Sequence, residues 1–269
     1  HPEAYWMSDA YYDETAHYIN RSPDSTPLNF VADWYVPWRK TNLERPIQRK
    51  DVAVRWTIKN AFVFPDDPGG LRVAFQVLAA PTSALLEAFL DPDAPIYVGA
   101  RADTQGLRPL YIYHIPRAEL DTHLAAARSA DVFAPGSETP IDGPVEVGDF
   151  LQFLGYEIAE PYVPADGNLQ VFTYWRVLQP PPEIAIFVHL LAPDGNLIAQ
   201  YDGFSVVASD LAPGDTVVQL HPLALPPSLP AGSYRLAVGA YTRADLQRIP
   251  LNTGTDHLYL ESWQLEHDS

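Results

Sequence analysis

The sequence contains no cysteine, and its 17 lysine and arginine residues face 34 aspartate and glutamate residues. Without cysteine there is neither a disulfide framework nor thiolate chemistry, and the chain suits a reducing or an oxidising compartment. The formal net charge of −17 argues against the clustered basic surface that nucleic-acid phosphates require. No apolar run approaches the roughly 18–20 residues of a membrane span, and no signal segment opens the chain. We therefore expect a soluble chain that does not bind nucleic acid.

Common catalytic motifs are also missing, since the sequence has no GxSxG, HExxH, Walker loop or GxGxxG pattern. The eight histidines are scattered, and His189, within an apolar strand, is predicted to be an inward residue with one hydrogen-bonding partner rather than a ligand. Three acidic pairs could bind calcium or act as paired acids, but their neighbours predict turns or a polar helix face. These pairs are Asp66-Asp67, Asp91/Asp93 and Asp13-Glu14. We expect no catalytic residue, no metal site and no cofactor.

The clearest structural signal in the chain is Val171–Tyr201. Its first part alternates between two sets of side chains, with Val171, Thr173 and Trp175 in one set, which is the period of a β-strand. Pro180 to Pro182 end that strand, and a second, almost wholly apolar strand then turns back at a Pro-Asp-Gly-Asn sequence. This pattern predicts a hairpin in a packed sheet.

The remainder of the C-terminal half repeats short strands between turn signals. Pro213-Gly214-Asp215 precedes one strand, and Ser233–Tyr241 alternates cleanly between two faces. Turn signals spaced about 8–12 residues apart are typical of a β-sandwich. We therefore predict an all-β sandwich of seven to nine strands, immunoglobulin-like or jelly-roll-like, at residues 149–269.

The N-terminal half mixes predicted helices with short strands. The predicted helices are Ala4–Asn20, Ser83–Leu90 and Arg117–Arg128. In the first of these, the spacing of Tyr5, Tyr12, Ala16 and Ile19 suits one buried helical face, although aromatic residues are also enriched at membrane interfaces. Residues 1–134 are therefore predicted to form an α/β domain with a leading helix. Residues 135–148, rich in proline and glycine, are predicted to be a linker.

Aromatic residues of the predicted sandwich are candidates for sugar contact, because tyrosine and tryptophan faces pack against pyranose rings. The candidates are Tyr162, Tyr174, Trp175 and Tyr201. Alternation places Tyr174 and Trp175 on opposite faces of one strand, so we expect that both cannot belong to the core. A structural role for these aromatics remains the alternative, because sandwiches bury most of their aromatic residues.

The order of features in the C-terminal half resembles a known family. An aromatic-Trp-Arg strand, an F-V-H-L strand, a D-G turn, a P-G-D turn and a P-x-G-x-Y-x-L-x-V-G-x-Y run follow one another within Phe150–Leu251. This order resembles the soluble tail after the last membrane helix of bacterial multi-spanning glycosyltransferases of the C superfamily, relatives of the dolichyl-phosphate-mannose protein mannosyltransferases. The N-terminal half is similar to the region just after the membrane part, although the similarity is weaker.

The resemblance implies a soluble extracytoplasmic accessory region of a membrane glycosyltransferase that uses a lipid-phosphate-linked sugar. Its partners would be the membrane-embedded part of the same polypeptide, which would tether it, and a glycan or acceptor. Enzymes of that family bind donor and metal among membrane helices, so the resemblance assigns no catalytic residue here, and we expect the isolated chain to be inactive. The sequence also begins at His1 without an initiator methionine, as a fragment would. The alternatives are a secreted or cell-surface carbohydrate- or protein-binding module and, with less support, a soluble enzyme.

Overall fold

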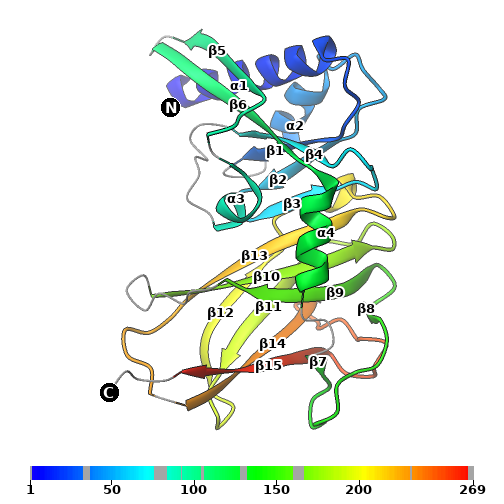
Figure 1. The fold of residues 1–269 in the computed structure, drawn as a ribbon, viewed down its shortest axis with the longest axis vertical. Coiled ribbons are helices and arrows are strands. Elements are labelled where there is room, and N and C mark those ends of the chain that lie inside the picture. Colours follow the sequence, from blue (N-terminus) through cyan, green and yellow to red (C-terminus); the bar gives the residue numbers. More distant parts are fainter. Residues whose placement is uncertain are drawn as a thin grey trace. The chain divides into compact units, whose positions relative to one another are not determined.

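The computed structural model describes residues 2–32, 37–75, 84–91, 93–103, 106–127, 132–159, 167–230 and 232–265 (Figure 1). The chain divides into two compact units. The first comprises His1–Thr122 with Ser205–Leu211, and the second comprises His123–Phe204 with Ala212–Ser269. The division falls within the helix at Arg117–Ala126, upstream of the predicted linker at residues 135–148. The predicted linker itself belongs to the second unit and includes the strand Val145–Val147.

The first unit is built on a mixed sheet with the strand order β2-β1-β4-β6-β5. Strand β1 runs parallel to β2 and β4, whereas β6 runs antiparallel to β4 and β5. Its elements, with α4 crossing into the second unit, are α1 (Pro2–Arg21), β1 (Leu28–Ala32), α2 (Pro37–Glu44), β2 (Val54–Ile58), β3 (Ala61–Phe64), β4 (Leu71–Phe75), α3 (Ala84–Phe89), β5 (Tyr97–Asp103), β6 (Gly106–Ile115) and α4 (Arg117–Ala126).

An aromatic cluster forms the core of this unit. The Tyr12 ring of α1 lies 5.3 Å from that of Phe30 and 5.6 Å from that of Trp56, measured between centroids. Ala16 and Ile19 share the buried face of α1, which is the face that helical spacing predicts. The predicted leading helix is therefore confirmed, and these residues belong to a protein core. None of the described helices is long and apolar enough to span a membrane.

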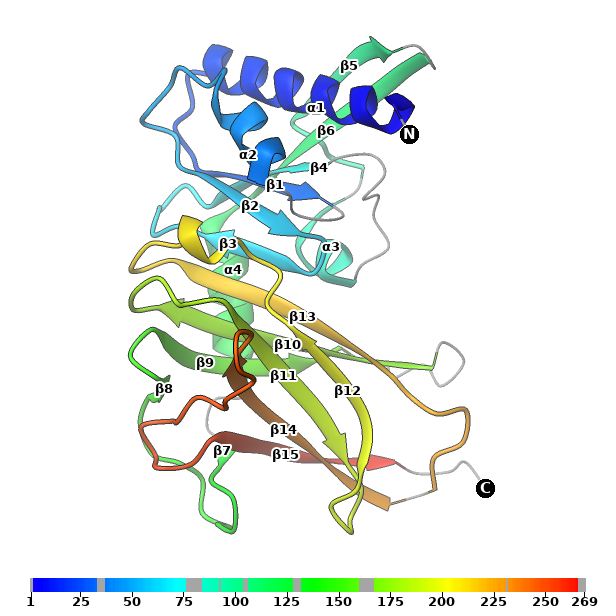
Figure 2. The ribbon, with the colours of Figure 1, turned by 180° about the vertical axis from the view of Figure 1, so that it is seen from behind.

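The second unit is a sandwich of two antiparallel sheets, seen from opposite sides in Figures 1 and 2. Within the unit, one sheet has the order β13-β10-β9-β8, and the other has the order β12-β11-β14-β15-β7. The nine strands among the described residues are β7 (Val132–Phe133), β8 (Val145–Val147), β9 (Leu151–Ile158), β10 (Asn168–Val177), β11 (Ile184–Leu191), β12 (Leu197–Gly203), β13 (Thr216–Ala224), β14 (Gly232–Thr242) and β15 (His257–Leu265). The predicted β-sandwich is confirmed, as is the hairpin that β11 and β12 form.

The sandwich core lies between the inward faces of the two sheets. On the first sheet, Thr173, Trp175 and Val177 alternate along β10 and are almost completely buried. On the second sheet, Val188 and Leu190 of β11 are fully buried. This arrangement leaves the odd-numbered residues of β11 on the opposite, outer face, because successive side chains of a strand point to opposite faces.

Candidate binding surface

The structure places two of the predicted sugar contacts in the protein interior. Tyr174 and Trp175 are both 0% exposed, so neither ring presents a free face. The expectation that one of them lies outside the core was wrong, because both faces of β10 are covered. The Trp175 ring packs 4.9 Å from Phe153, and its indole N–H donates to the Thr173 hydroxyl over 2.8 Å.

The side of β10 that carries Tyr174 is part of a hydrogen-bonded group with the last turn of α4. The Tyr174 hydroxyl donates to Oε1 of Glu157 over 2.6 Å, and Nδ1 of His123 lies 3.2 Å from the same oxygen. Burial, reinforced by the Glu157 carboxylate, raises the pKa of Tyr174 far above its ordinary value. Tyr174 therefore stays protonated and acts as a donor that holds Glu157 in place.

Of the other two predicted contacts, only Tyr201 lies among the described residues. Tyr201 is half-buried, and its ring meets the His221 ring edge-on at 5.6 Å, on the inner side of the sheet. Tyr162 lies outside the described residues. The structure therefore does not join the three described candidates, Tyr174, Trp175 and Tyr201, into one exposed surface.

Polar and aromatic side chains of the sandwich lie together on a different surface. It is the outer face of the β12-β11-β14-β15-β7 sheet, which we call the outer face. Cross-strand pairing sets two rows of residues side by side on β11, β14 and β15. The first row consists of His189, Ala237 and Tyr259, and the second row consists of Phe187, Gly239 and His257. The central strand β14 contributes only small residues to both rows, so the larger side chains on either side can lean over it.

At the β12 side of the outer face, Asp202 accepts hydrogen bonds from one residue of β11 and one residue of β14. Nε2 of His189 lies 3.1 Å from Oδ1 of Asp202, and the Tyr241 hydroxyl donates to Oδ2 over 3.2 Å. Burial lowers the pKa of His189, although the nearby Asp202 charge opposes that shift. Burial and Asp202 both raise the pKa of Tyr241. Asp202 is thus the hydrogen-bonding partner that the sequence suggested for His189, but His189 lies on the outer face rather than in the core.

Next to this group, Phe187 is covered by charged residues. Phe187 is only 1% exposed, although it lies on the outer face, and the Arg248 guanidinium sits 4.8 Å from its ring centroid. Arg248 in turn lies 3.4 Å from both carboxylate oxygens of Asp256. The hydrogen bond from His257, together with the Arg248 charge, lowers the pKa of Asp256. The end of the outer face around Phe187 is therefore covered by other side chains of the protein and offers no open surface to a ligand.

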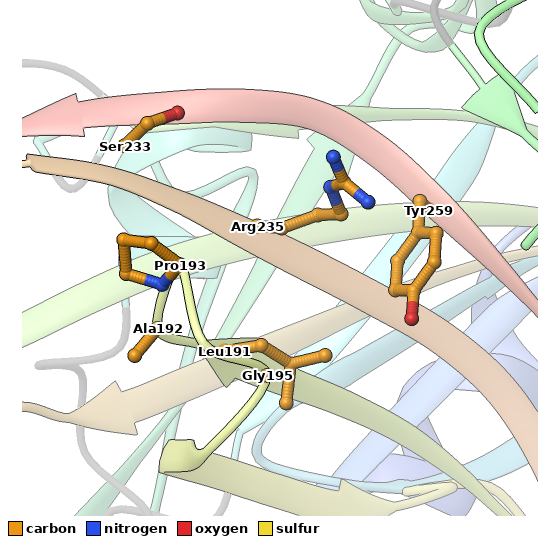
Figure 3. Close-up of a pocket in the computed structure, with 7 residues that line it drawn as sticks. All are labelled: Leu191, Ala192, Pro193, Gly195, Ser233, Arg235 and Tyr259. Carbon is orange, nitrogen blue, oxygen red and sulfur yellow. The ribbon is translucent and has the colours of Figure 1, made fainter. Parts of the chain in front are cut away.

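The other end of the outer face is open, and two hollows lie there. The first, which we call the turn hollow, has a volume of about 290 Å³ and is drawn in Figure 3. It is lined by Leu191 to Pro193, Gly195, Ser233, Arg235 and Tyr259. The second hollow, of about 150 Å³, shares Arg235 and Tyr259 and adds Phe133, Ser137, Glu138, Leu260 and Ser262. The Arg235 guanidinium lies 4.8 Å from the centroid of the Tyr259 ring, between the two hollows.

Sequence reasoning did not find Arg235 and Tyr259, although the pattern contained a signal. Within Ser233–Tyr241, the face opposite the apolar residues includes an exposed arginine, which is a polar position on a half-buried strand. Tyr259 occupies the corresponding outer position in the last strand. The predicted sugar contacts were chosen only because they are aromatic. That criterion selected Tyr174 and Trp175 of β10, where both faces of the strand are covered.

The described residues do not form a recognisable metal centre. No group of three or more histidine, aspartate or glutamate side chains within the described ranges could hold a metal ion. The acidic pairs near Asp67 and Asp91 have the geometry of turns, because each carboxylate accepts the backbone N–H two residues later.

Comparison with known proteins identifies no family. No family model and no curated protein matches the chain. Among solved structures, the C-terminal domain of wzt is similar with a TM-score of 0.33 and 14% identity, over 48% of this chain and 81% of that one. Chicken MD-1 complexed with lipid IVa is similar with a TM-score of 0.23 and 12% identity, over 45% of this chain and 98% of that one. Likeness at these TM-scores does not support a conclusion about function.

Proposed function

We propose that the second unit is a non-catalytic carbohydrate-binding module whose binding surface is the open end of the outer face. The observation that carries this proposal is the position of Tyr259 and Arg235 between two hollows. A saccharide needs an apolar surface for its C–H face and hydrogen-bonding groups for its hydroxyls. Tyr259 supplies the first, and Arg235, Ser233 and Glu138 supply the second.

The pairing of Arg235 with Tyr259 also reduces the cost of binding. A guanidinium resting on an aromatic ring at 4.8 Å is held by a cation–π contact and by packing of its stem. Its donors are thereby partly ordered before a ligand arrives, so less side-chain entropy is lost when a ligand binds. This preorganisation favours a binding role for an arginine that is exposed on an otherwise acidic protein.

We further propose that this module belongs to the extracytoplasmic accessory region of a membrane glycosyltransferase using a lipid-phosphate-linked sugar. The support is the resemblance carried by Phe150–Leu251. In that setting the module would bind or position the glycan or acceptor, while the preceding membrane-embedded part of the same polypeptide would carry out the transfer. The alternative is a secreted or cell-surface carbohydrate- or protein-binding module. Reading the gene upstream of His1 separates the two, because a short reading frame without membrane helices would eliminate the accessory-region proposal.

Titration of the purified chain against a panel of soluble oligosaccharides tests the binding proposal. We expect affinity in the millimolar range, because one stacked ring contributes only about 0.5–1.5 kcal/mol beyond area burial. Tyr259→Ala should abolish that binding, whereas Tyr111→Ala, a matched change on β6 of the first unit, should leave it intact. Chemical-shift mapping by NMR should place the perturbed amides on β14 and β15. Absence of binding by every glycan, or perturbations confined to the first unit, would reject the proposed surface.

A further inference from the structure

The turn hollow differs in charge from the rest of the protein. The chain carries a formal net charge of −17, yet the side chains that line this hollow include one arginine, one serine and no acid. Asp194 lies in the turn beside the hollow, but its carboxylate is directed to its own turn, where it accepts hydrogen bonds from the backbone and side-chain amides of Asn196. Glu138 lines the second hollow and not the turn hollow. The positive charge of Arg235 therefore dominates the wall of the turn hollow.

Arg235 is also available for a ligand. The Arg235 guanidinium contacts the Tyr259 ring, and among the residues that the structure describes no carboxylate forms an ion pair with Arg235. Figure 3 shows Arg235 and Ser233 on the same strand, β14, with Leu191 at the end of β11 and Pro193 in the turn that follows it. A guanidinium presents N–H donors in a fork that matches the two oxygens of a carboxylate. The hollow therefore combines an anion-binding fork with apolar walls.

We propose that the turn hollow recognises the carboxylate of an acidic saccharide, such as a uronic acid residue. This inference rests on the carbohydrate-binding function proposed above. Arg235 donates two hydrogen bonds to the carboxylate, and the Ser233 hydroxyl contacts a neighbouring ring oxygen or hydroxyl. The apolar edge of the pyranose packs against Leu191 and Pro193. The volume of about 290 Å³ is at the lower end of ligand pockets, which suits a single sugar residue of a longer glycan.

One experiment can vary the charge of the ligand and the side chain at position 235 independently. Calorimetric titration would compare α-1,4-linked trigalacturonate with the matched neutral galactotriose, using the full chain. We expect the acidic trisaccharide to bind about tenfold more tightly or better, as a charge-assisted bidentate contact provides. Arg235→Gln should remove this preference. Arg235→Lys should lose most of it, because lysine retains the charge but lacks the fork.

Arg176→Gln is the matched control, since it removes the same charge from an exposed arginine on the other sheet and should change neither affinity. Equal affinities for the two trisaccharides, with or without Arg235, would overturn the carboxylate inference while leaving the carbohydrate surface standing. Failure of both trisaccharides and of the wider glycan panel would reject both proposals. If galactose 6-phosphate bound as tightly as trigalacturonate and inorganic phosphate displaced either, the hollow would be a general anion site and carboxylate recognition would be wrong.

Discussion

The Thr173 hydroxyl lies 2.8 Å from Nε2 of His221 in the core of the sandwich. Thr173 already accepts the indole N–H of Trp175, and donation of its own proton to His221 leaves the fewest buried groups unpaired. His221 is then neutral, with its proton on Nδ1, an atom that has no hydrogen-bond partner among the described groups. The three residues form a short polar chain within an apolar core, so the protonation state of His221 affects the stability of the whole sandwich.

Loss of stability at acidic pH should depend on His221. Complete burial lowers its pKa to about 3, below the ordinary value of 6.5. Above about pH 6.5 the side chain is neutral in both states, and its full contribution to stability is present. Between about pH 6.5 and 3 only the unfolded chain takes up the proton, so the free energy of unfolding falls by up to about 1.4 kcal/mol per pH unit.

Urea unfolding at pH 7, 6, 5 and 4 should show a shallower pH dependence for His221→Gln than for the wild type. The comparison uses the slope with pH, so a uniform loss of stability in the variant does not obscure it. Equal slopes in the two proteins would mean that His221 accepts a proton in the folded state.

Trp175→Ala should cost about 3–5 kcal/mol in the free energy of unfolding, because a fully buried indole is replaced by a cavity. Trp175→Phe keeps most of the packing against Phe153 and loses the hydrogen bond to Thr173, so its cost should be smaller. Chemical denaturation followed by circular dichroism measures both changes. A free energy of unfolding unaffected by Trp175→Ala would place the ring at the surface instead.

Gly239→Ala should destabilise the sandwich by about 1–3 kcal/mol through overpacking. A Cβ atom at this position would lie 2.5 Å from Cζ of Phe187 and 2.8 Å from the backbone oxygen of Asp256. Gly232→Ala, on the same strand, is the matched control, because the nearest atom to its new Cβ is Cγ of Pro193 at 3.9 Å. Thermal melting compares the two, and an equal effect of both substitutions would contradict the close packing of Phe187 over β14.

The isolated chain should neither transfer nor hydrolyse sugars. No catalytic motif was found in the sequence, and the resemblance assigns catalysis to membrane helices elsewhere in such proteins. Assays with soluble nucleotide-sugars and chromogenic glycosides, at protein concentrations in the micromolar range, should give no turnover above buffer. Turnover that survives purification and is abolished by a point substitution in the chain would overturn the non-catalytic assignment.

The sequence by itself determined the local structure of much of this protein. Helical spacing of Tyr12, Ala16 and Ile19 identified the buried face of α1, and two-residue alternation identified β10 and β14. These predictions succeeded because periodicity is a property of neighbouring residues. Helix α2 was not predicted, since its sequence is short and polar, and it is tied down by Lys40, whose Nζ lies 2.5 Å from Asp210 far along the chain.

Only the tertiary structure decided which faces meet solvent. Alternation separates Tyr174 from Trp175 but cannot show that both sides of β10 are covered, because the covering residues come from other strands and from α4. The same limit applies to Arg235 and Tyr259, which lie 24 positions apart in the sequence and meet only because β14 pairs with β15. A binding surface made by cross-strand neighbours depends on register, and register is fixed by the packing of the whole sandwich.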